Sequence, residues 1–174
     1  MRRFGLIVII TIGAAFLSAT AVAQQTAPPA KSAEQSAAQS NAKKAYSGMY
    51  AFLKEGEFVQ LTVEDDGSIT GLVSRFGNGE SDKGAFLGQF FKSGKLEGNK
   101  LNFTTEIVHG VSFDFKGTVE RGEGKNPGDE AYFVLKGTLT ENVTDVNKKS
   151  TSHAQEVAFK MFPQEASPTP VMRK

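Results

Sequence analysis

The two histidines of the chain, His109 and His153, carry the side chains best suited to acid–base chemistry near neutral pH. His153 follows Ser150 and Ser152, so a serine nucleophile with a histidine base is the reaction to consider. Neighbours in sequence on a loop do not form a catalytic triad, however, and no oxyanion hole can be identified. We therefore interpret both histidines as surface residues and predict that the protein is not an enzyme.

The remaining reactive side chains do not indicate a metal or a cofactor. The chain contains no Cys, which excludes disulfides, thiolate metal sites and thiol nucleophiles. The acidic segment Glu64-Asp65-Asp66 lacks the ligand spacing of an EF-hand, and Gly67 after it is typical of a turn. The glycine-rich segment 122–128 lacks the Gly-Lys-Ser/Thr sequence of a phosphate-binding loop.

Aromatic side chains are the stronger candidates for a binding site. The chain has 14 Phe and 3 Tyr but no Trp. Several of them recur at alternate positions of short apolar runs, which predicts that they share the inner face of a sheet. We expect the wall of a ligand site to consist of Tyr50, Phe52, Phe103, Phe113, Phe115, Phe133 and Phe159.

Such a wall favours an apolar ligand. A polar ligand buried in a barrel needs convergent donors and acceptors, and the inward set offers little beyond Thr105 and the Tyr50 hydroxyl. The alternative is that the rings simply fill the interior as a packed core.

The elements that position these side chains are short runs rich in Val, Phe, Ile and Thr, separated by turns, which is typical of an all-β protein. We predict strands at 46–53, 57–64, 68–76, 85–97, 100–108, 111–121, 131–141 and 155–162. Tight turns at Asp65-Asp66-Gly67, Gly98-Asn99 and His109-Gly110 require antiparallel neighbours. The chain therefore predicts an eight-stranded antiparallel up-and-down β-barrel, with a two-sheet sandwich as the alternative.

Alternation also predicts which residues point inward. The inner faces are expected to contain Gly48, Val59, Leu61, Val63, Leu101, Thr105, Ile107, Val111, Gly117, Val119, Leu135, Gly137, Leu139, Val157 and Met161 besides the seven aromatic residues. Met49, Leu53, Phe91 and Val134 are expected to lie outside, where they offer a patch for pairing of two barrels.

The ends of the chain differ in composition from this middle part. Residues 1–23 combine a basic start, an apolar run and Ala21-Val22-Ala23, which predicts a secretory signal peptide cut after Ala23. Residues 24–45 are expected to be a disordered linker, 46–163 the barrel domain and 164–174 a disordered tail. We therefore expect a secreted or periplasmic protein without a membrane span after cleavage.

The net charge of the chain is +1, which argues against nucleic acid as a partner. A homo-oligomer or a protein partner remains open. Asn142 begins an Asn-Val-Thr glycosylation sequon, which matters only in a host that glycosylates.

A family resemblance supports the barrel. The layout of Gly48-Met49-Tyr50, the hairpin Asp66-Gly67-Ser68-Ile69-Thr70-Gly71, the loop Gly77-Asn78-Gly79-Glu80-Ser81 and Phe86-Leu87-Gly88 resembles the avidin and streptavidin family. The fold also looks like that of lipocalins, although Tyr50 replaces the Trp of their Gly-x-Trp signature. The avidin family binds biotin with tryptophans and with Asn, Ser, Tyr, Thr and Asp side chains. Here Phe52, Gly56 and Val73 fall near the family's Asn, Ser and Tyr, so biotin binding is not implied.

These observations predict a non-enzymatic barrel that binds a small apolar ligand in its Phe-lined interior. The alternative is a protein-interaction or inhibitor module with a packed barrel, which acts through its loops and N-terminal segment.

Overall fold

The computed structural model describes residues 44–145 and 147–164. The predicted signal peptide, nearly all of the predicted linker and nearly all of the predicted tail lie outside these ranges. Within the ranges, no helix has the length and apolar character that a membrane crossing requires.

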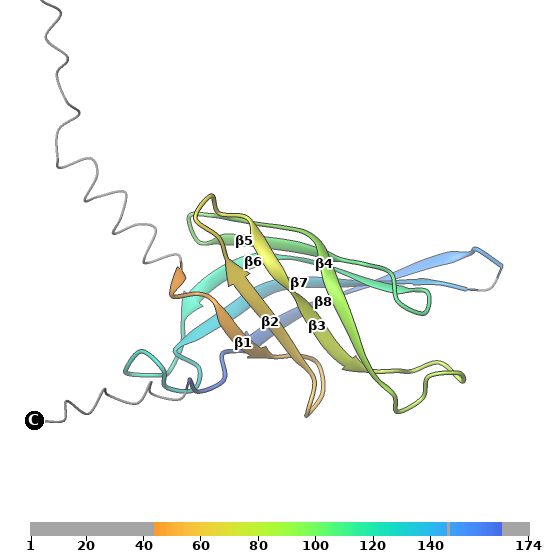
Figure 1. The fold of residues 1–174 in the computed structure, drawn as a ribbon, viewed down its shortest axis with the longest axis horizontal. Coiled ribbons are helices and arrows are strands. Elements are labelled where there is room, and N and C mark those ends of the chain that lie inside the picture. The colour runs from red at the N-terminus through yellow and green to blue at the C-terminus, as the bar shows by residue number, and fades with distance from the viewer. Residues whose placement is uncertain (1–43, 146, 165–174) are drawn as a thin grey trace, which may run out of the picture.

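Eight antiparallel strands form one curled sheet in which each strand pairs with the next along the chain (Figure 1). This arrangement confirms the predicted all-β class and the up-and-down order. The strands are β1 (Gly48–Ala51), β2 (Phe58–Val63), β3 (Ile69–Phe76), β4 (Phe86–Glu97), β5 (Lys100–Thr105), β6 (Val111–Arg121), β7 (Phe133–Thr144) and β8 (Ser150–Lys160).

The sheet curls until its first and last strands meet. Tyr50 of β1 forms an antiparallel bridge with Met161, directly after β8, and the Phe162 N–H donates to the Met49 carbonyl at 2.8 Å. A bulge between Phe91 and Ser93 shifts the register of β4, as expected where a strand bends from one half of a barrel into the other. The sequential strand order does not match a Greek-key sandwich.

Close backbone contact between β6 and β7 explains two of the glycines in the strands. Gly117 and Gly137 lie opposite each other, and a Cβ atom on Gly117 would meet the Lys136 carbonyl oxygen at 2.1 Å. A side chain at this position would therefore force the strands apart.

The His109-Gly110 turn is a two-residue hairpin, as predicted. Both residues have positive φ angles, 51° for His109 and 78° for Gly110, and Val108 pairs with Val111 across the turn. Positive φ at both central positions is the geometry of a type I′ turn, whose twist matches that of the flanking strands.

The core lies inside the curled sheet, and most of the predicted inner faces are confirmed. Alternate residues of β2, β5, β6 and β7 are buried together with Phe159 and Met161. Ile107, predicted to point inward, is 68% exposed because β5 ends at Thr105 and the chain turns outward before β6.

Two other expectations were wrong. The sequence predicted strands that end at 141 and begin again at 155, but β7 continues to Thr144 and β8 begins at Ser150. Residues 142–144 and 150–154 therefore lengthen the hairpin beyond the core (Figure 1). In the predicted outer patch, Met49 and Leu53 are exposed, whereas Val134 is buried. Phe91 turns toward the core and its ring stacks on Phe103, with 4.4 Å between ring centroids.

Candidate functional site

The seven predicted wall residues all lie in one buried cluster inside the sheet. The Phe52 ring contacts Phe113 and Phe159, with centroid distances of 5.3 and 5.1 Å, and Phe115 stacks on Phe103 at 5.3 Å. At the other end of the cluster, the Tyr50 hydroxyl donates to the Tyr46 carbonyl at 2.7 Å. Burial raises the pKa of the Tyr50 phenol far above its ordinary value, so this group stays protonated.

These rings fill the space that they enclose. Phe133 and Phe52, the most exposed of the seven, retain only 9% and 8% of their surface, and the others retain 2% or less. A cavity that admits water would appear as exposed surface on its lining rings. In the described state a ligand therefore enters the interior only if a ring moves.

A surface hollow lies away from these rings. It is a shallow depression of about 740 Å³ at the end of the barrel that carries the β6–β7 loop, lined by residues such as Gly124, Asp129 and Lys160. None of the seven aromatic residues lines it.

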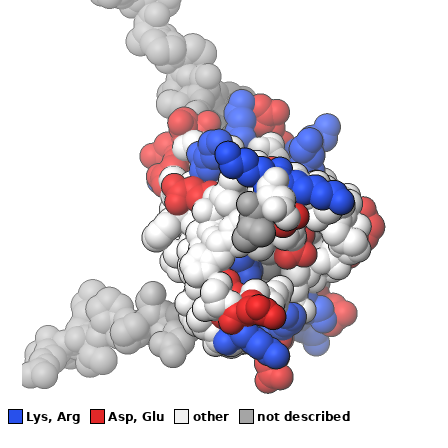
Figure 2. Space-filling model, turned by 90° about the vertical axis from the view of Figure 1, so that its right-hand side faces the viewer, with Lys and Arg blue, Asp and Glu red and all other residues white. Residues whose placement is uncertain are grey.

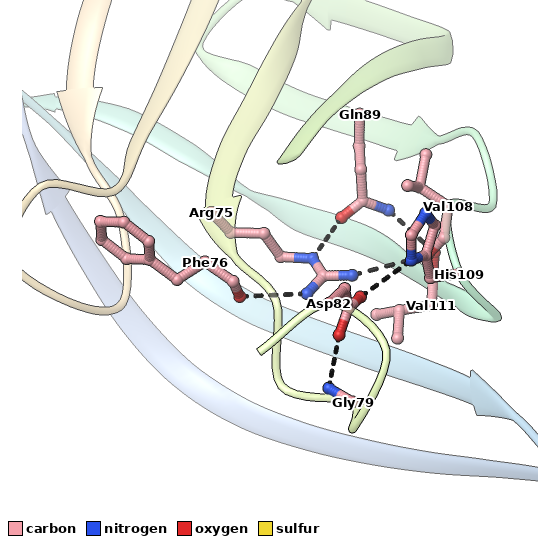
Figure 3. A network of polar contacts seen from close by, with 8 residues as sticks. All are labelled: Arg75, Phe76, Gly79, Asp82, Gln89, Val108, His109 and Val111. Carbon is pink, nitrogen blue, oxygen red and sulfur yellow. Dashed lines mark hydrogen bonds and ion pairs between the residues drawn. The ribbon is translucent and has the colours of Figure 1, made fainter. Parts of the chain in front are cut away.

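A buried polar layer closes the opposite end of the interior, where the loops β1–β2, β3–β4 and β5–β6 meet (Figure 3). Arg75 and Gln89 form its centre, and both side chains are buried. The Arg75 Nε–H donates to the Gln89 Oε1 at 2.6 Å. The Gln89 amide in turn donates to the carbonyls of Glu106 and Val111, at 3.2 and 2.8 Å. Gln89 therefore holds the Arg75 side chain and the residues on both sides of the β5–β6 turn in place.

The Arg75 guanidinium is a buried positive charge held by neutral groups. Its terminal nitrogens donate to the carbonyls of Phe76, at 3.2 Å, and Val108, at 3.5 Å. It lies over the Phe113 ring, 5.8 Å from the centroid. Among the described residues, no carboxylate oxygen lies within 4.0 Å of a guanidinium nitrogen of Arg75. Buried charges are normally paired, because desolvation of an unpaired ion is costly.

Two acidic side chains buried at the same end already have hydrogen-bond partners in the loops. The Asp82 carboxylate accepts the Gly79 N–H at 2.7 Å and contacts the His109 Nδ1 at 3.0 Å. The Glu57 carboxylate accepts the backbone N–H groups of Phe76 and Lys54. Both carboxylates therefore stabilise loops.

Side-chain contacts join the three loops over Arg75. Asp82 of the loop 77–85 contacts His109 of the β5–β6 turn, and the Lys54 ammonium donates to the Asn78 side chain at 3.1 Å. His109 is half exposed whereas Asp82 is buried, so the contact lies at the surface of this end. Figure 2 faces this end and shows a broad area without acidic or basic side chains between charged groups.

Sequence reasoning missed Arg75 and Gln89. The alternation that places Val73 inside also places Arg75 inside, and Gln89 lies opposite Val73 in the β3–β4 register. The signal was therefore present, but a charged residue at the end of a strand is usually solvated. Thr105, which was predicted to point inward, accepts the Phe113 N–H at 2.9 Å near the point where β5 leaves the sheet.

The serine and histidine considered for catalysis do not form a dyad. Ser152 and His153 are consecutive residues of β8, so their side chains point to opposite faces. The Ser152 hydroxyl donates to the Asn142 side chain at 2.7 Å, and Asn142 lies within β7. In the described part of the chain, no group of three or more His, Cys, Asp or Glu residues is placed to hold a metal ion.

Comparison with solved structures identifies the fold. The crystal structure of rhizavidin superposes with a TM-score of 0.52 at 8% identity, over 75% of this chain and 92% of that chain. The crystal structure of a rhizavidin–biotin complex matches at 8% identity with a TM-score of 0.48, over 71% of this chain and 97% of that chain. No protein-family model and no curated protein sequence matches the chain. The avidin-like resemblance is thus confirmed for the fold.

Proposed function

We propose that this protein is an exported, non-enzymatic β-barrel that binds one small ligand through an apolar body in its aromatic interior. The observation that carries the proposal is the position of Phe52. Its ring packs on Phe113 and Phe159, yet Phe52 lies after the end of β1 and outside the strands. Rotation of this one ring opens the interior without breaking a strand pair.

The surroundings of Phe52 support entry at this end. The residues 52–57 connect β1 to β2, and loops unfold locally at a lower free energy than paired strands. The polar layer of Arg75 and Gln89 lies at the same end of the interior. A ligand with an apolar body and one polar group matches this arrangement, because the body would contact the aromatic rings and the polar group would contact the layer of Arg75 and Gln89.

Export rests on the signal peptide predicted for residues 1–23. Amino-terminal sequencing of the protein purified from its natural source tests this part. We expect the mature chain to begin at Gln24, and a chain that keeps Met1 or Arg2 would contradict export with cleavage.

Ligand binding is tested by titration of the mature protein with 1-octanol, followed by methyl NMR. The proposal predicts saturable shifts of the Met161 and Leu139 methyl groups, which lie in the buried cluster. Phe90→Ala serves as the control, because Phe90 is 60% exposed on the outer face and its removal leaves the interior intact. Shifts confined to surface methyl groups, or no saturation, would contradict interior binding.

A second candidate is a protein-interaction or inhibitor module with a permanently packed barrel. The close packing of the seven rings is the observation that favours it. In that case octanol leaves the interior methyl resonances unchanged, and the protein purified from its natural source carries a protein partner.

A further inference from the structure

We propose that Arg75 is the anion-binding residue of this barrel and that the small ligand carries a carboxylate beside its apolar body. The inference rests on the proposed function and adds the chemical class of the ligand. Its starting point is the mismatch at Arg75, a buried cation whose three hydrogen-bond acceptors are all neutral oxygen atoms.

The hydrogen-bond inventory of Arg75 leaves room for a carboxylate. A guanidinium has five N–H groups, and the described residues provide three acceptors. One N–H on each terminal nitrogen therefore has no acceptor among them. The planar fork of a guanidinium matches the two oxygens of a carboxylate, and such charge-assisted bonds are stronger than those to neutral acceptors.

Arg75 is also held in place before any ligand arrives. The bond to Gln89 fixes the Nε side of the guanidinium, and Gln89 is itself anchored to the carbonyls of Glu106 and Val111. Because the cation is already oriented, a ligand does not have to order it. The Phe113 ring beneath it links the charged group to the apolar interior.

The loop 77–85 covers this site in the described state. Asp82 anchors the loop to His109, and Lys54 anchors it to the β1–β2 loop through Asn78. The charged and titratable side chains of the three loops at this end are Lys54, Glu55, Glu57, Glu80, Asp82, Lys83, Glu106 and His109. Among the described residues, none of these side chains forms a hydrogen bond or an ion pair with Arg75. Separation of Asp82 from His109 and of Lys54 from Asn78 would release the loop and leave the Arg75–Gln89 bond in place.

The test compares octanoate with 1-octanol, which share a chain length but differ in charge, by calorimetric titration of the mature protein. We expect octanoate to bind roughly tenfold more tightly than octanol. Arg75→Gln should weaken octanoate binding roughly tenfold, so that octanoate and octanol bind the variant about equally. Arg121→Gln is the matched control, because it removes one positive charge at the opposite end of the barrel, where Arg121 lies over the Tyr132 ring.

The outcomes separate this inference from the proposed function. Equal binding of octanoate and octanol to the wild-type protein would overturn the carboxylate site and leave the apolar binder intact. Binding of neither probe would overturn both. If Arg75→Gln does not fold, the test instead follows the NMR resonance of the Arg75 Nε–H in the wild-type protein during titration with each probe. That resonance must shift with octanoate and not with octanol, and the reverse result would overturn the inference.

Discussion

The Nε–H of Arg75 donates to the Oε1 of Gln89 at 2.6 Å across the β3–β4 pair, inside the barrel and out of contact with solvent. This bond joins the two buried polar residues at the centre of the layer that closes the aromatic interior. It also links β4 to the β5–β6 turn, because the Gln89 amide donates to carbonyls on both sides of that turn.

Replacement of Gln89 should therefore be costly. Gln89→Leu leaves the buried Arg75 Nε–H and the carbonyls of Glu106 and Val111 without these partners. We expect the free energy of unfolding, measured in urea, to fall by about 2 to 4 kcal/mol. Gln60→Leu on the exposed face of β2 is the control and should change it by less than about 0.5 kcal/mol. Equal effects of the two substitutions would contradict the role of Gln89.

The close approach of β6 and β7 predicts a contrast between two glycines. Gly117→Ala places a Cβ 2.1 Å from the Lys136 carbonyl oxygen, whereas a Cβ on Gly88 meets no atom within 4 Å. In thermal unfolding, Gly117→Ala should lower the melting temperature by roughly 8 °C or more, for a loss of at least about 2 kcal/mol. Gly88→Ala should leave it unchanged or raise it slightly. A mild effect at Gly117 would contradict the close strand contact.

His109 has two roles: it adopts the positive φ of the turn, and its side chain contacts Asp82. Two substitutions test these roles separately. His109→Gly removes the imidazole but favours the φ of 51°, so the stability of the hairpin should be retained while the loop 77–85 exchanges its amide hydrogens faster. His109→Val should additionally cost about 1 to 2 kcal/mol, because a β-branched residue resists this conformation. Unchanged exchange in His109→Gly would mean that Asp82 does not depend on His109.

The loop between β6 and β7 should loosen in acid. The Asp129 carboxylate accepts the backbone N–H of Asn126, and this bond is the largest cause that lowers the pKa of Asp129 below its ordinary value. A lowered folded-state pKa contributes stability above the unfolded pKa, and this contribution is lost as the pH falls through the folded value. The Asn126 amide resonance should therefore titrate with a midpoint below about 3.9, and Asp129→Asn should abolish that titration. A midpoint at or above this value would contradict the interaction.

Sequence patterns predicted the strands correctly where buried apolar residues alternate with polar ones. Phe113 and Phe115 were placed inside because their neighbours are polar, and both are buried. The outer part of the β7–β8 hairpin was missed because it lies beyond the core and most of its pairs, such as Asn142 with Ser152 and Thr144 with Ser150, are polar on both strands. Backbone pairing holds this part together, and backbone pairing leaves no apolar pattern in the sequence.

The candidate site was predicted in its apolar part only. Alternation identified the rings, but it does not report whether they enclose a space, since that depends on how far the sheet curls. The polar layer depends on contacts between residues distant in sequence, such as Asp82 with His109 and Arg75 with Val108. Such contacts follow from the closure of the barrel, which brings the three loops to one end.

The most direct test of small-ligand binding is native mass spectrometry of the mature protein purified from its natural source, recorded under gentle conditions and again after denaturation. We expect a bound molecule of small mass that leaves when the barrel unfolds, and a carboxylate on that molecule would agree with the role of Arg75. A protein that carries no small molecule when purified in this way, or that carries a protein partner instead, would contradict binding of a small ligand in the barrel.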